Sequence, residues 1–392
     1  MRSGLTIPKH LVLVGGGHAH LTMLADCRDY VDRGVRVTLV SASPYHYYSG
    51  MGPGLLAGTY RPQDIRFHIR RTVTDRGAEF IKDRVIRVDP IERELFLQSG
   101  RTIGYDVVSF NTGSDVVLPP GEQDGGNLFP VKPIVSLLFA RRAIIARLRQ
   151  GRTRIVVIGG GPAGVEIAGN AWRLVQDQGG QAQITVITGK ELLSGRPRRL
   201  QALARRSLLQ RGIVVRDGHY AERTGKNEVA LTTGESLQAD IVLVATGIRT
   251  SSLFKDSGLP VGPDGGLLVN RFLQSTAYPE IFGGGDAICF EPRPLAKVGV
   301  YAVRENRILS QNILASFGAG GLVPFEPQQK FMLIFNMGND RGILTRENFS
   351  WYGWLPWKLK DWIDRSFMNK FQVSGERNEA TTEEKEEQYG HS

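Results

Sequence analysis

Cysteine is almost absent from this chain of 392 residues, which contains only Cys27 and Cys289 and no C-x-x-C pair. A disulfide scaffold and a thiolate zinc site are therefore disfavoured, and we expect no metal site. Cys27 falls in an expected helix, residues 19–30, where a small core residue is the simplest interpretation. Cys289 follows a Gly-Asp motif, so the alternatives there are a core residue and a neighbour of a bound cofactor.

Long apolar runs are also absent. No stretch of about 18 apolar residues exists, so no segment is expected to span a membrane. A strand is predicted from residue 11 onward, which leaves no room for a signal peptide. We therefore expect a cytoplasmic protein, with peripheral attachment to the inner face of the membrane as the alternative.

The charge balance is basic, with a formal net charge of +10. Such a balance favours phosphate-bearing ligands, acidic membrane surfaces or nucleic acid. No basic module interleaved with aromatic residues, of the kind that binds RNA or single strands, is present, and most arginines are scattered. Nucleic acid is therefore not expected as a partner.

Glycine is plentiful, at 47 residues, and one glycine motif organises the chain. Within residues 154–169, the apolar run 155–158 predicts a buried strand, and a G-x-G-x-x-G turn leads at once into a helical pattern. This context indicates a dinucleotide-binding turn, with a plain strand–turn–helix as the alternative. Gly159 then makes the tight turn, Gly161 admits a pyrophosphate and Gly164 lets the helix pack on the strand. The phosphates are expected at the helix N-terminus.

A second unit of the same kind opens the chain at residues 11–17, LVLVGGG. Gly15 and Gly17 keep the spacing, but His20 stands at the third glycine position, where its side chain either displaces the helix or turns aside. The following strand ends at Ser41 in place of the acidic residue that usually holds a ribose hydroxyl. Ser41 still offers one hydrogen bond.

Residues 44–58 are dense in glycine, proline and tyrosine, which predicts a loop at the carboxyl end of that strand. Ligands bind at this end of open α/β sheets. The tyrosines and His46 are expected to flank a planar ring; the alternative is a loop packed by its own aromatic residues.

Two matching stretches, 105–113 and 239–247, each carry an Asp, an apolar strand and Thr-Gly, which indicates an internal repeat of the two units. The stretch 279–287, PEIFGGGDA, adds a strand, a glycine turn and Asp286, and a helical pattern follows at 300–314.

The second unit's next strand ends at Thr188 instead of an acidic residue. Basic side chains follow closely, which suits the 2′-phosphate of NADPH. These side chains are Lys190, Arg196, Arg198 and Arg199. The alternative is that the last of them simply begin a helix over 198–210.

The C-terminal part predicts a small antiparallel sheet at 326–350, an amphipathic helix within 351–373 and a disordered acidic tail at 374–392. Helical spacing places one set inward: Leu359, Trp362, Ile363, Ser366, Phe367 and Phe371. It leaves another outward: Lys358, Lys360, Asp361, Asp364, Arg365 and Lys370. The helix is expected to lie on a membrane surface; the alternatives are the protein's own core and a homodimer contact.

Together these motifs resemble the two-dinucleotide flavoprotein superfamily, with the FAD/NAD(P)-dependent pyridine nucleotide-disulfide oxidoreductase fold, and within it the type II NADH dehydrogenases. A closer resemblance is to dehydrogenase-like flavoproteins found alone or fused to selenide, water dikinase. It is carried by GGGHAH at 15–20, YSGMGPGLLAG at 48–58, PLAKVGVYAVREN at 294–306 and KDWIDRSFMNKF at 360–371.

The resemblance implies an α/β protein with two Rossmann-like domains, the second inserted in the first, plus a small C-terminal α+β segment. The FAD-binding domain is expected at 1–115 and 266–325, and the NAD(P)H-binding domain at 116–265. The C-terminal sheet and amphipathic helix are expected at 326–373.

The resemblance also implies site residues. For FAD these are Gly15, Gly17, His20, Ser41, Ser49, Gly50, Thr112, Gly113, Asp286, Lys297 and Val298. For NAD(P)H they are Gly159, Gly161, Gly164 and Gly247. Glu166 is the expected catalytic carboxylate near the nicotinamide and the flavin; the alternative is a carboxylate favoured by the helix dipole. Lys297, with the following helix N-terminus, is expected to stabilise negative charge on reduced flavin.

The implied function is an FAD-dependent NAD(P)H dehydrogenase that passes electrons to a quinone or another small acceptor. No cysteine falls within residues 41–58, so direct transfer from flavin to acceptor is favoured over thiol chemistry. Arg304 and Glu305 replace the double Gln that helps frame many quinone pockets of the family. The alternatives are an oxidoreductase with a protein or a sulfur or selenium partner, and a non-catalytic redox sensor.

Overall fold

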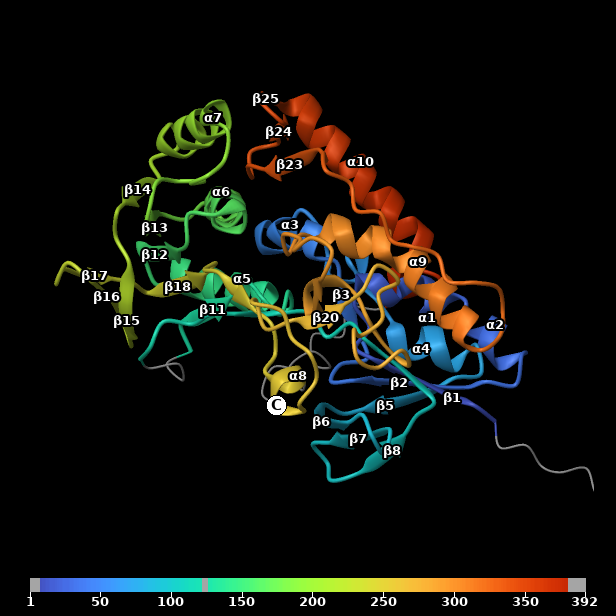
Figure 1. The fold of residues 1–392 in the computed structure, drawn as a ribbon. Helices are drawn as coiled ribbons and strands as arrows, with labels where there is room; N and C mark the ends of the chain where they lie inside the picture. Colours follow the sequence, from blue (N-terminus) through green and yellow to red (C-terminus); the bar gives the residue numbers. More distant parts are fainter. Residues whose placement is uncertain (1–7, 122–125, 380–392) are drawn as a thin grey trace, which may run out of the picture.

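Two parallel sheets with equivalent strand orders form the frame of the protein (Figure 1). The structure is a computed structural model and describes residues 8–121 and 126–379. The first sheet has the order β21-β9-β1-β2-β5, from Ile281–Gly283, Val107–Phe110, His10–Val14, Arg36–Ser41 and Glu79–Lys82. The second has the order β11-β18-β12-β13-β14, from Leu128–Pro130, Ile241–Val244, Thr153–Ile158, Ala182–Thr188 and Val214–Asp217.

The predicted internal repeat is confirmed by these sheets. Strands β1 and β12, which lead into the glycine turns, pair in parallel with β9 and β18, which precede the Thr-Gly pairs. The strands of the second sheet all lie between β9 and β21 in the chain, so the second unit is inserted in the first, as predicted. Each strand order reverses beside a glycine turn, which places a ligand crevice at both carboxyl edges.

Apolar runs drive this arrangement, because parallel strands are covered on both faces. Leu11, Leu13, Ile155 and Val157 have no exposed surface. The covering helices are α3 Gly52–Ala57, α5 Ser136–Leu148, α6 Pro162–Asp177, α7 Arg198–Leu209 and α9 Gly299–Ser316. The predicted helices at 198–210 and 300–314 correspond to α7 and α9.

Two local predictions were wrong. The single helix expected over 19–30 is broken into η1 His18–His20, α1 Leu21–Ala25 and α2 Cys27–Val31. The loop expected over 44–58 contains β3 His46–Tyr47, η2 Ser49–Met51 and α3. Glycine is a poor helix former, but Gly52 lets α3 approach α5 closely, since a Cβ there would lie 3.2 Å from Leu137 Cδ1.

The remaining elements are short. The antiparallel ribbons are β6 Val85–Asp89, β7 Glu94–Leu97 and β8 Thr102–Gly104, and β15 Ala221–Gly225, β16 Glu228–Leu231 and β17 Ser236–Gln238. The two-stranded pairs are β3 with β4 Arg66–Phe67, β10 Asp115–Val116 with β19 Ile248–Arg249, and β20 Leu267–Val269 with β22 Ile288–Phe290. Short helices are η3 Pro62–Asp64, α4 Ile69–Thr74, α8 Leu253–Asp256, η4 Gly285–Ala287 and η5 Glu376–Asn378.

The C-terminal segment joins the two units. Its antiparallel sheet, as predicted, consists of β23 Leu333–Asn336, β24 Gly342–Arg346 and β25 Phe349–Gly353. This sheet lies against α6 and α7 and adds Phe335 and Ile343 to the second core. Helix α10, Trp354–Phe371, then extends towards the first unit (Figure 1), where Met368 and Phe371 join the first core.

The predicted orientation of α10 was right only in part. Phe371 is buried and Leu359 and Phe367 are half-buried, as predicted, and the predicted outward residues Lys358, Arg365 and Lys370 are exposed. Trp362 is 67% exposed and Ile363 is 36% exposed, so these residues face outward. Lys360 and Asp364 face inward, with side chains only 14% and 5% exposed. Helical spacing alone predicts apolar side chains in the interior. Lys360 and Asp364 lie there instead because polar groups from other parts of the fold bind them.

The start of the acidic tail is not a free chain. Ser374 and Glu376 are buried, and Glu376 is only 1% exposed. Residues 374–379 therefore pack against the protein, contrary to the expectation for 374–392. Residues 380–392 lie outside the described part of the chain.

Candidate functional site

The second glycine turn has the geometry that a dinucleotide requires. Gly159 has φ +120°, and a Cβ there would overlap the backbone carbonyl of Ala245. A Cβ at Gly164 would overlap the carbonyl oxygen of Gly159, so helix and strand can meet only without a side chain. Around Gly161 and Gly247, by contrast, a Cβ would meet no heavy atom of the described chain within 4 Å. The space beside the N-terminus of α6 is therefore open to a phosphate.

The first turn is built around Asn111, which follows β9. Gly15 has φ +84° and lies against the Asn111 carbonyl, while the Asn111 side chain lies beside both Gly17 and Gly285. One residue thus brings together the Gly15–Gly17 turn, Thr112 and the Gly-Asp motif. Asn111 Nδ2 is buried without a hydrogen-bond partner in the described residues.

His20 turns aside from the helix, which decides between the two predicted alternatives. Its Nδ1 lies 2.6 Å from the Gly15 carbonyl and its Nε2 2.9 Å from Ser109 Oγ. Burial lowers the pKa of His20 to about 4, so the ring is neutral. His20 therefore ties the turn to β9 in place of the missing glycine.

Asp286 lies in a polar cluster that includes a residue the sequence analysis missed. Lys132 Nζ lies 2.6 Å from Asp286 Oδ2, and Ser114 Oγ donates to the same oxygen at 2.8 Å. Beside it, the Gly285 N–H donates to buried Glu305 Oε2 at 2.5 Å. The turn that presents Asp286 is thus held from both sides.

The N-terminus of α9 closes this region. Val298 and Lys297 line a narrow cavity together with Asp286 and Glu305. Ser49 Oγ lies 3.9 Å from the Cβ position of Gly299, so the 48–58 segment meets the start of α9. The Lys297 amine is held by the Ile288 carbonyl and lies 2.9 Å from Asp264 Oδ2.

Glu166 of the second unit is hydrogen-bonded to the C-terminal sheet. Its Oε1 accepts the Asn336 N–H at 2.7 Å. Burial raises the pKa of Glu166 to about 7, against the opposing charge of Lys360 and the Asn336 N–H. Lys360 Nζ donates to the Gly50 carbonyl at 2.9 Å and to Asp364 Oδ2 at 2.8 Å. Burial disfavours the Lys360 charge, but Asp364 and Glu166 outweigh burial and raise the pKa of the amine.

An aromatic cluster borders this network on the side of the first turn. Tyr48 OH donates to Asp364 at 3.1 Å, and its ring lies 4.8 Å from that of Phe367. The rings of His18 and His46 are 4.7 Å apart, with His46 Nε2 3.3 Å from His18 Nδ1. Burial lowers the pKa of His18 to about 4. Its Nε2 has no hydrogen-bond partner in the described chain.

The two cysteines are poor nucleophiles in this setting. Both are buried and free, Cys27 in α2 and Cys289 in β22. Burial raises the pKa of Cys27 to about 12 and also raises that of Cys289, which lies near Asp264. Thiolates attack and thiols do not, so neither residue is prepared for redox chemistry.

Replacing Glu305 with Gln should stabilise the protein in alkaline solution only. Burial raises the pKa of Glu305 to about 7, whereas an exposed Glu titrates near about 4.3. The folded state therefore binds this proton more tightly, and stability falls by up to about 4 kcal/mol as pH rises through this range. Gln keeps an acceptor for Gly285. Thermal unfolding near about pH 5 and pH 8.5 checks the prediction; parallel pH profiles for the two proteins would contradict it.

The sequence analysis missed several of these residues. Asn111 had one available signal, because its counterpart before the second Thr-Gly is Ala245. Lys132 gave none, since its partners are remote in sequence. His18 lies within the motif GGGHAH but had no expected role, and Lys360 was expected on the outward face of its helix. Of the predicted residues, Gly15, Gly17 and Thr112 meet at the first turn. Asp286, Lys297 and Val298 line one cavity, and Ser49 lies beside the start of α9. Ser41 ends β2, Gly113 follows β9, and the Gly50 carbonyl is bound by Lys360.

Comparison with known proteins supports the same fold and chemistry. The model of the family described as pyridine nucleotide-disulphide oxidoreductase matches residues 9–307. The oxidoreductase ptaL of Pestalotiopsis fici is 24% identical over 364 residues, covering 88% of this chain and 94% of its own length. Ferroptosis suppressor protein 1 of Taeniopygia guttata is 26% identical over 284 residues, covering 68% of this chain and 71% of its own.

Solved structures share the fold. The sulfide:quinone oxidoreductase of Aquifex aeolicus superposes with a TM-score of 0.77 at 19% identity, over 96% of this chain and 94% of its own. NDH2 of Plasmodium falciparum, solved in complex with NADH, gives 0.77 at 14% identity, over 94% and 98%. At these identities the likeness concerns the fold alone.

Proposed function

The chain belongs to the pyridine nucleotide-disulphide oxidoreductase family, and from that premise we propose that it is an FAD-dependent NAD(P)H dehydrogenase that reduces a quinone or another small acceptor. The observation that carries the proposal is the contact between the two units. Lys360 binds the Gly50 carbonyl of the first unit and lies in the electrostatic field of Glu166 on the second. Lys360 therefore interacts with Gly50, which we assign to the flavin, and with Glu166, which we assign to the nicotinamide.

The residues of the first turn fit FAD. Asn111 Nδ2 and His18 Nε2 are buried polar atoms without partners in the described residues, and such atoms are costly unless a ligand satisfies them. Asp286, with Lys132 and Ser114, offers an acceptor for sugar-like hydroxyls. We assign 1–115 and 266–325 to FAD and 116–265 to NAD(P)H. When bound, FAD accepts a hydride from NAD(P)H and passes the electrons on singly or in pairs.

The chain's own residues supply position and charge. Ionised Glu166, on the first turns of α6, would stabilise the positive charge that develops on the nicotinamide ring as its hydride leaves. Because the pKa of Glu166 is about 7, this carboxylate is half formed near neutrality. The Lys360 charge favours this ionised form, while its amine donates to the Gly50 carbonyl and to Asp364. Tyr48 donates to Asp364 beside the aromatic cluster. We place the acceptor beside that cluster, formed by His18, Tyr48 and Phe367.

Thiol chemistry is the weaker alternative. The raised pKa values of Cys27 and Cys289 oppose thiolate formation. Both cysteines can be changed to Ser as a direct test. Lost turnover with intact bleaching of the flavin would favour a sulfur or selenium route over the proposed one.

The test of the proposed function is anaerobic mixing of the purified yellow protein with NADH and NADPH separately. Rapid bleaching by either nucleotide is expected, followed by reoxidation when a short-chain quinone is added. A protein that neither nucleotide bleaches would overturn the proposal. A bleached protein that no small acceptor reoxidises would support electron transfer from NAD(P)H to FAD but contradict the reduction of a small acceptor.

We also propose that α10 lies on a membrane surface. Its outward side chains include Trp354, Leu355, Trp362 and Ile363, which are 54%, 44%, 67% and 36% exposed. Lys358, Arg365 and Lys370 lie among them, and tryptophan with basic residues suits a lipid interface. Within the described residues, no helix has the length and apolarity to cross a membrane.

The variant Trp354→Ser/Trp362→Ser should bind anionic vesicles about tenfold more weakly or worse, because two apolar anchors are lost. Ile91→Ser is the matched control, since Ile91 is 74% exposed on a different surface. Vesicle co-sedimentation measures the effect. Equal binding by both variants would contradict the membrane proposal, and a dimer lost only in the tryptophan variant would indicate a homodimer contact.

A further inference from the structure

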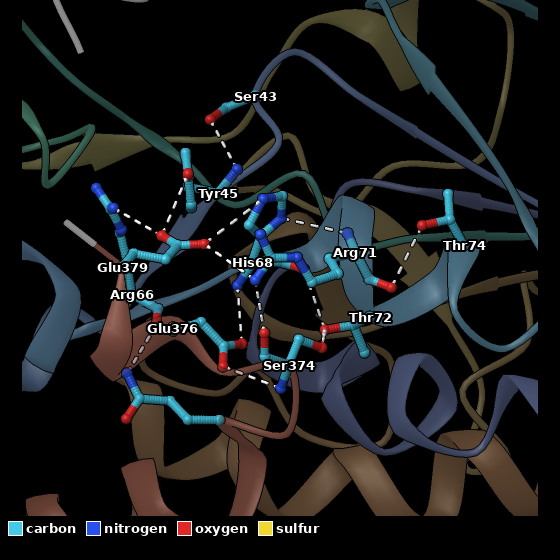
Figure 2. Close-up of polar contacts among 11 residues, drawn as sticks. Ser43, Tyr45, Arg66, His68, Arg71, Thr72, Thr74, Ser374, Glu376 and Glu379 are labelled. Atoms are coloured by element: carbon cyan, nitrogen blue, oxygen red, sulfur yellow. Dashed lines mark hydrogen bonds and ion pairs between the residues drawn. The ribbon is translucent and has the colours of Figure 1, made fainter. Parts of the chain in front are cut away.

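Residues 372–379 form a segment that we call the C-terminal strap. It leaves the end of α10 and packs along β4 and α4 (Figure 2). Gln372 Nε2 donates to the backbone carbonyls of Gln63 and Arg66 at 2.8 and 2.9 Å. The strap is thus hydrogen-bonded to both η3 and β4 before it turns at Gly375, which has φ +76°.

The middle of the strap is held by a buried carboxylate. Glu376 accepts the His68 N–H on one oxygen and the Ser374 N–H on the other, each at 3.0 Å. Ser374 Oγ lies 2.9 Å from Thr72 Oγ1, and Arg71 Nη1 donates to the Ser374 carbonyl at 2.8 Å. Backbone N–H groups bonded to a carboxylate are strong contacts, so this part of the strap is firmly seated.

At the end of the strap, the Glu379 carboxylate lies among positively charged side chains. Glu379 Oε2 accepts from Arg66 Nη2 at 2.8 Å and from Tyr45 OH at 3.3 Å. His68 Nε2 and Arg71 Nη1 lie 3.8 and 3.5 Å from Glu379 Oε1. The Arg66 and Glu379 side chains are only 7% and 13% exposed, and Figure 2 shows the side chains converging on this carboxylate. Breaking a buried pair by removing one partner is strongly destabilising.

The surface under the strap is the two-stranded pair of β3 and β4, which reaches the site. Strand β4 pairs with β3 through His46–Phe67 and Tyr47–Arg66, and the Tyr48 N–H bonds to the Ile65 carbonyl beside them. So short a pair is marginal by itself. Strand β3 carries His46, whose ring contacts that of His18 at the first glycine turn. The strap thus supports β4, while β3 carries one member of the buried histidine pair.

We propose that Glu376 and Glu379 are positioning residues that hold the β3–β4 pair, and with it the His18–His46 pair, against the first glycine turn. The use of that histidine pair by the acceptor rests on the proposed function; the mechanical coupling does not. Loss of the strap's carboxylates should loosen residues 43–47 and slow electron transfer to the acceptor. Bleaching by NAD(P)H, which depends on α6 and on residues outside 43–47, should remain unchanged.

The test uses the full-length protein with Glu376→Gln/Glu379→Gln. The control is Glu347→Gln, because Glu347 pairs with Lys330 on the surface and is 52% exposed. Hydrogen–deuterium exchange of the amides in residues 43–47 should rise about tenfold in the double variant and stay unchanged in the control. Reoxidation of the bleached protein by the quinone should fall about tenfold, with bleaching by nucleotide unaltered. Glu379→Asp should restore part of both losses.

Unchanged exchange in residues 43–47 would overturn the positioning role. Faster exchange with unchanged reoxidation would overturn its link to the acceptor. A wild-type protein that nucleotide does not bleach would refute the proposed function, while the exchange result would still decide the strap's role. If the double variant does not fold, Glu379→Gln alone keeps the Glu376 contacts and is measured in the same way.

Discussion

Gly161→Val is expected to abolish bleaching by NAD(P)H while leaving the fold and the bound FAD intact. Gly161 has ordinary extended backbone angles, φ −77° and ψ −176°, as the N-cap of α6. No heavy atom of the described chain lies within 4 Å of its Cβ position. A valine therefore meets only what the nucleotide would occupy, and its cost to helix capping is about 1 kcal/mol.

The expected loss in nucleotide affinity is about 100-fold or more, close to about 3 kcal/mol, because the pyrophosphate can no longer approach the helix N-terminus. Titration of bleaching against NADH and NADPH measures it. Gly247→Val, at the other open glycine, should behave alike, whereas Gly321→Val, open but distant from both turns, should have no effect. Wild-type affinity in Gly161→Val with normal folding would place the nucleotide elsewhere.

The parts of the fold that the sequence predicted are those encoded by short-range patterns. These patterns are runs of apolar residues, glycines at fixed spacing and Thr-Gly pairs, and each occupies fewer than about twenty residues. The sheet then sets the register in which the apolar strands pair. The twin sheets and both turns followed from these patterns. His20 shows the limit, because Ser109, which its imidazole contacts, could not be inferred from the motif.

The parts that the sequence missed depend on partners remote in the chain. Local spacing put Lys360 and Asp364 on the water-facing side of α10, but Gly50 and Tyr48 draw them inward. The strap is a second example. Its acidic composition predicts disorder, but Arg66 is a buried partner for Glu379. Burial of charge is therefore decided by tertiary pairing, which periodicity does not report.

Lys360→Met should destabilise the protein by about 3–5 kcal/mol, because Asp364, 5% exposed, loses its cationic partner within the core. Lys360→Met/Asp364→Leu should recover most of that loss, since both charges are then absent. Chemical denaturation of the FAD-loaded proteins measures both. Equal destabilisation of the single and double variants would mean that packing, and not the charge pair, explains the loss.

The same variants also test the role of Glu166, through the pH dependence of the bleaching rate. Burial raises the pKa of Glu166 to about 7; Lys360 opposes this rise, and Asp364 adds to it. Because ionised Glu166 would stabilise the positive nicotinamide, the rate of bleaching should rise with pH through about 7 in the wild type. Lys360→Met should move that rise to higher pH, the double variant should return it toward the wild-type position, and Glu166→Gln should remove it. A wild-type rate that is flat across this range, or a rise that persists in Glu166→Gln, would assign the titration to another group and leave Lys360 with a structural role only.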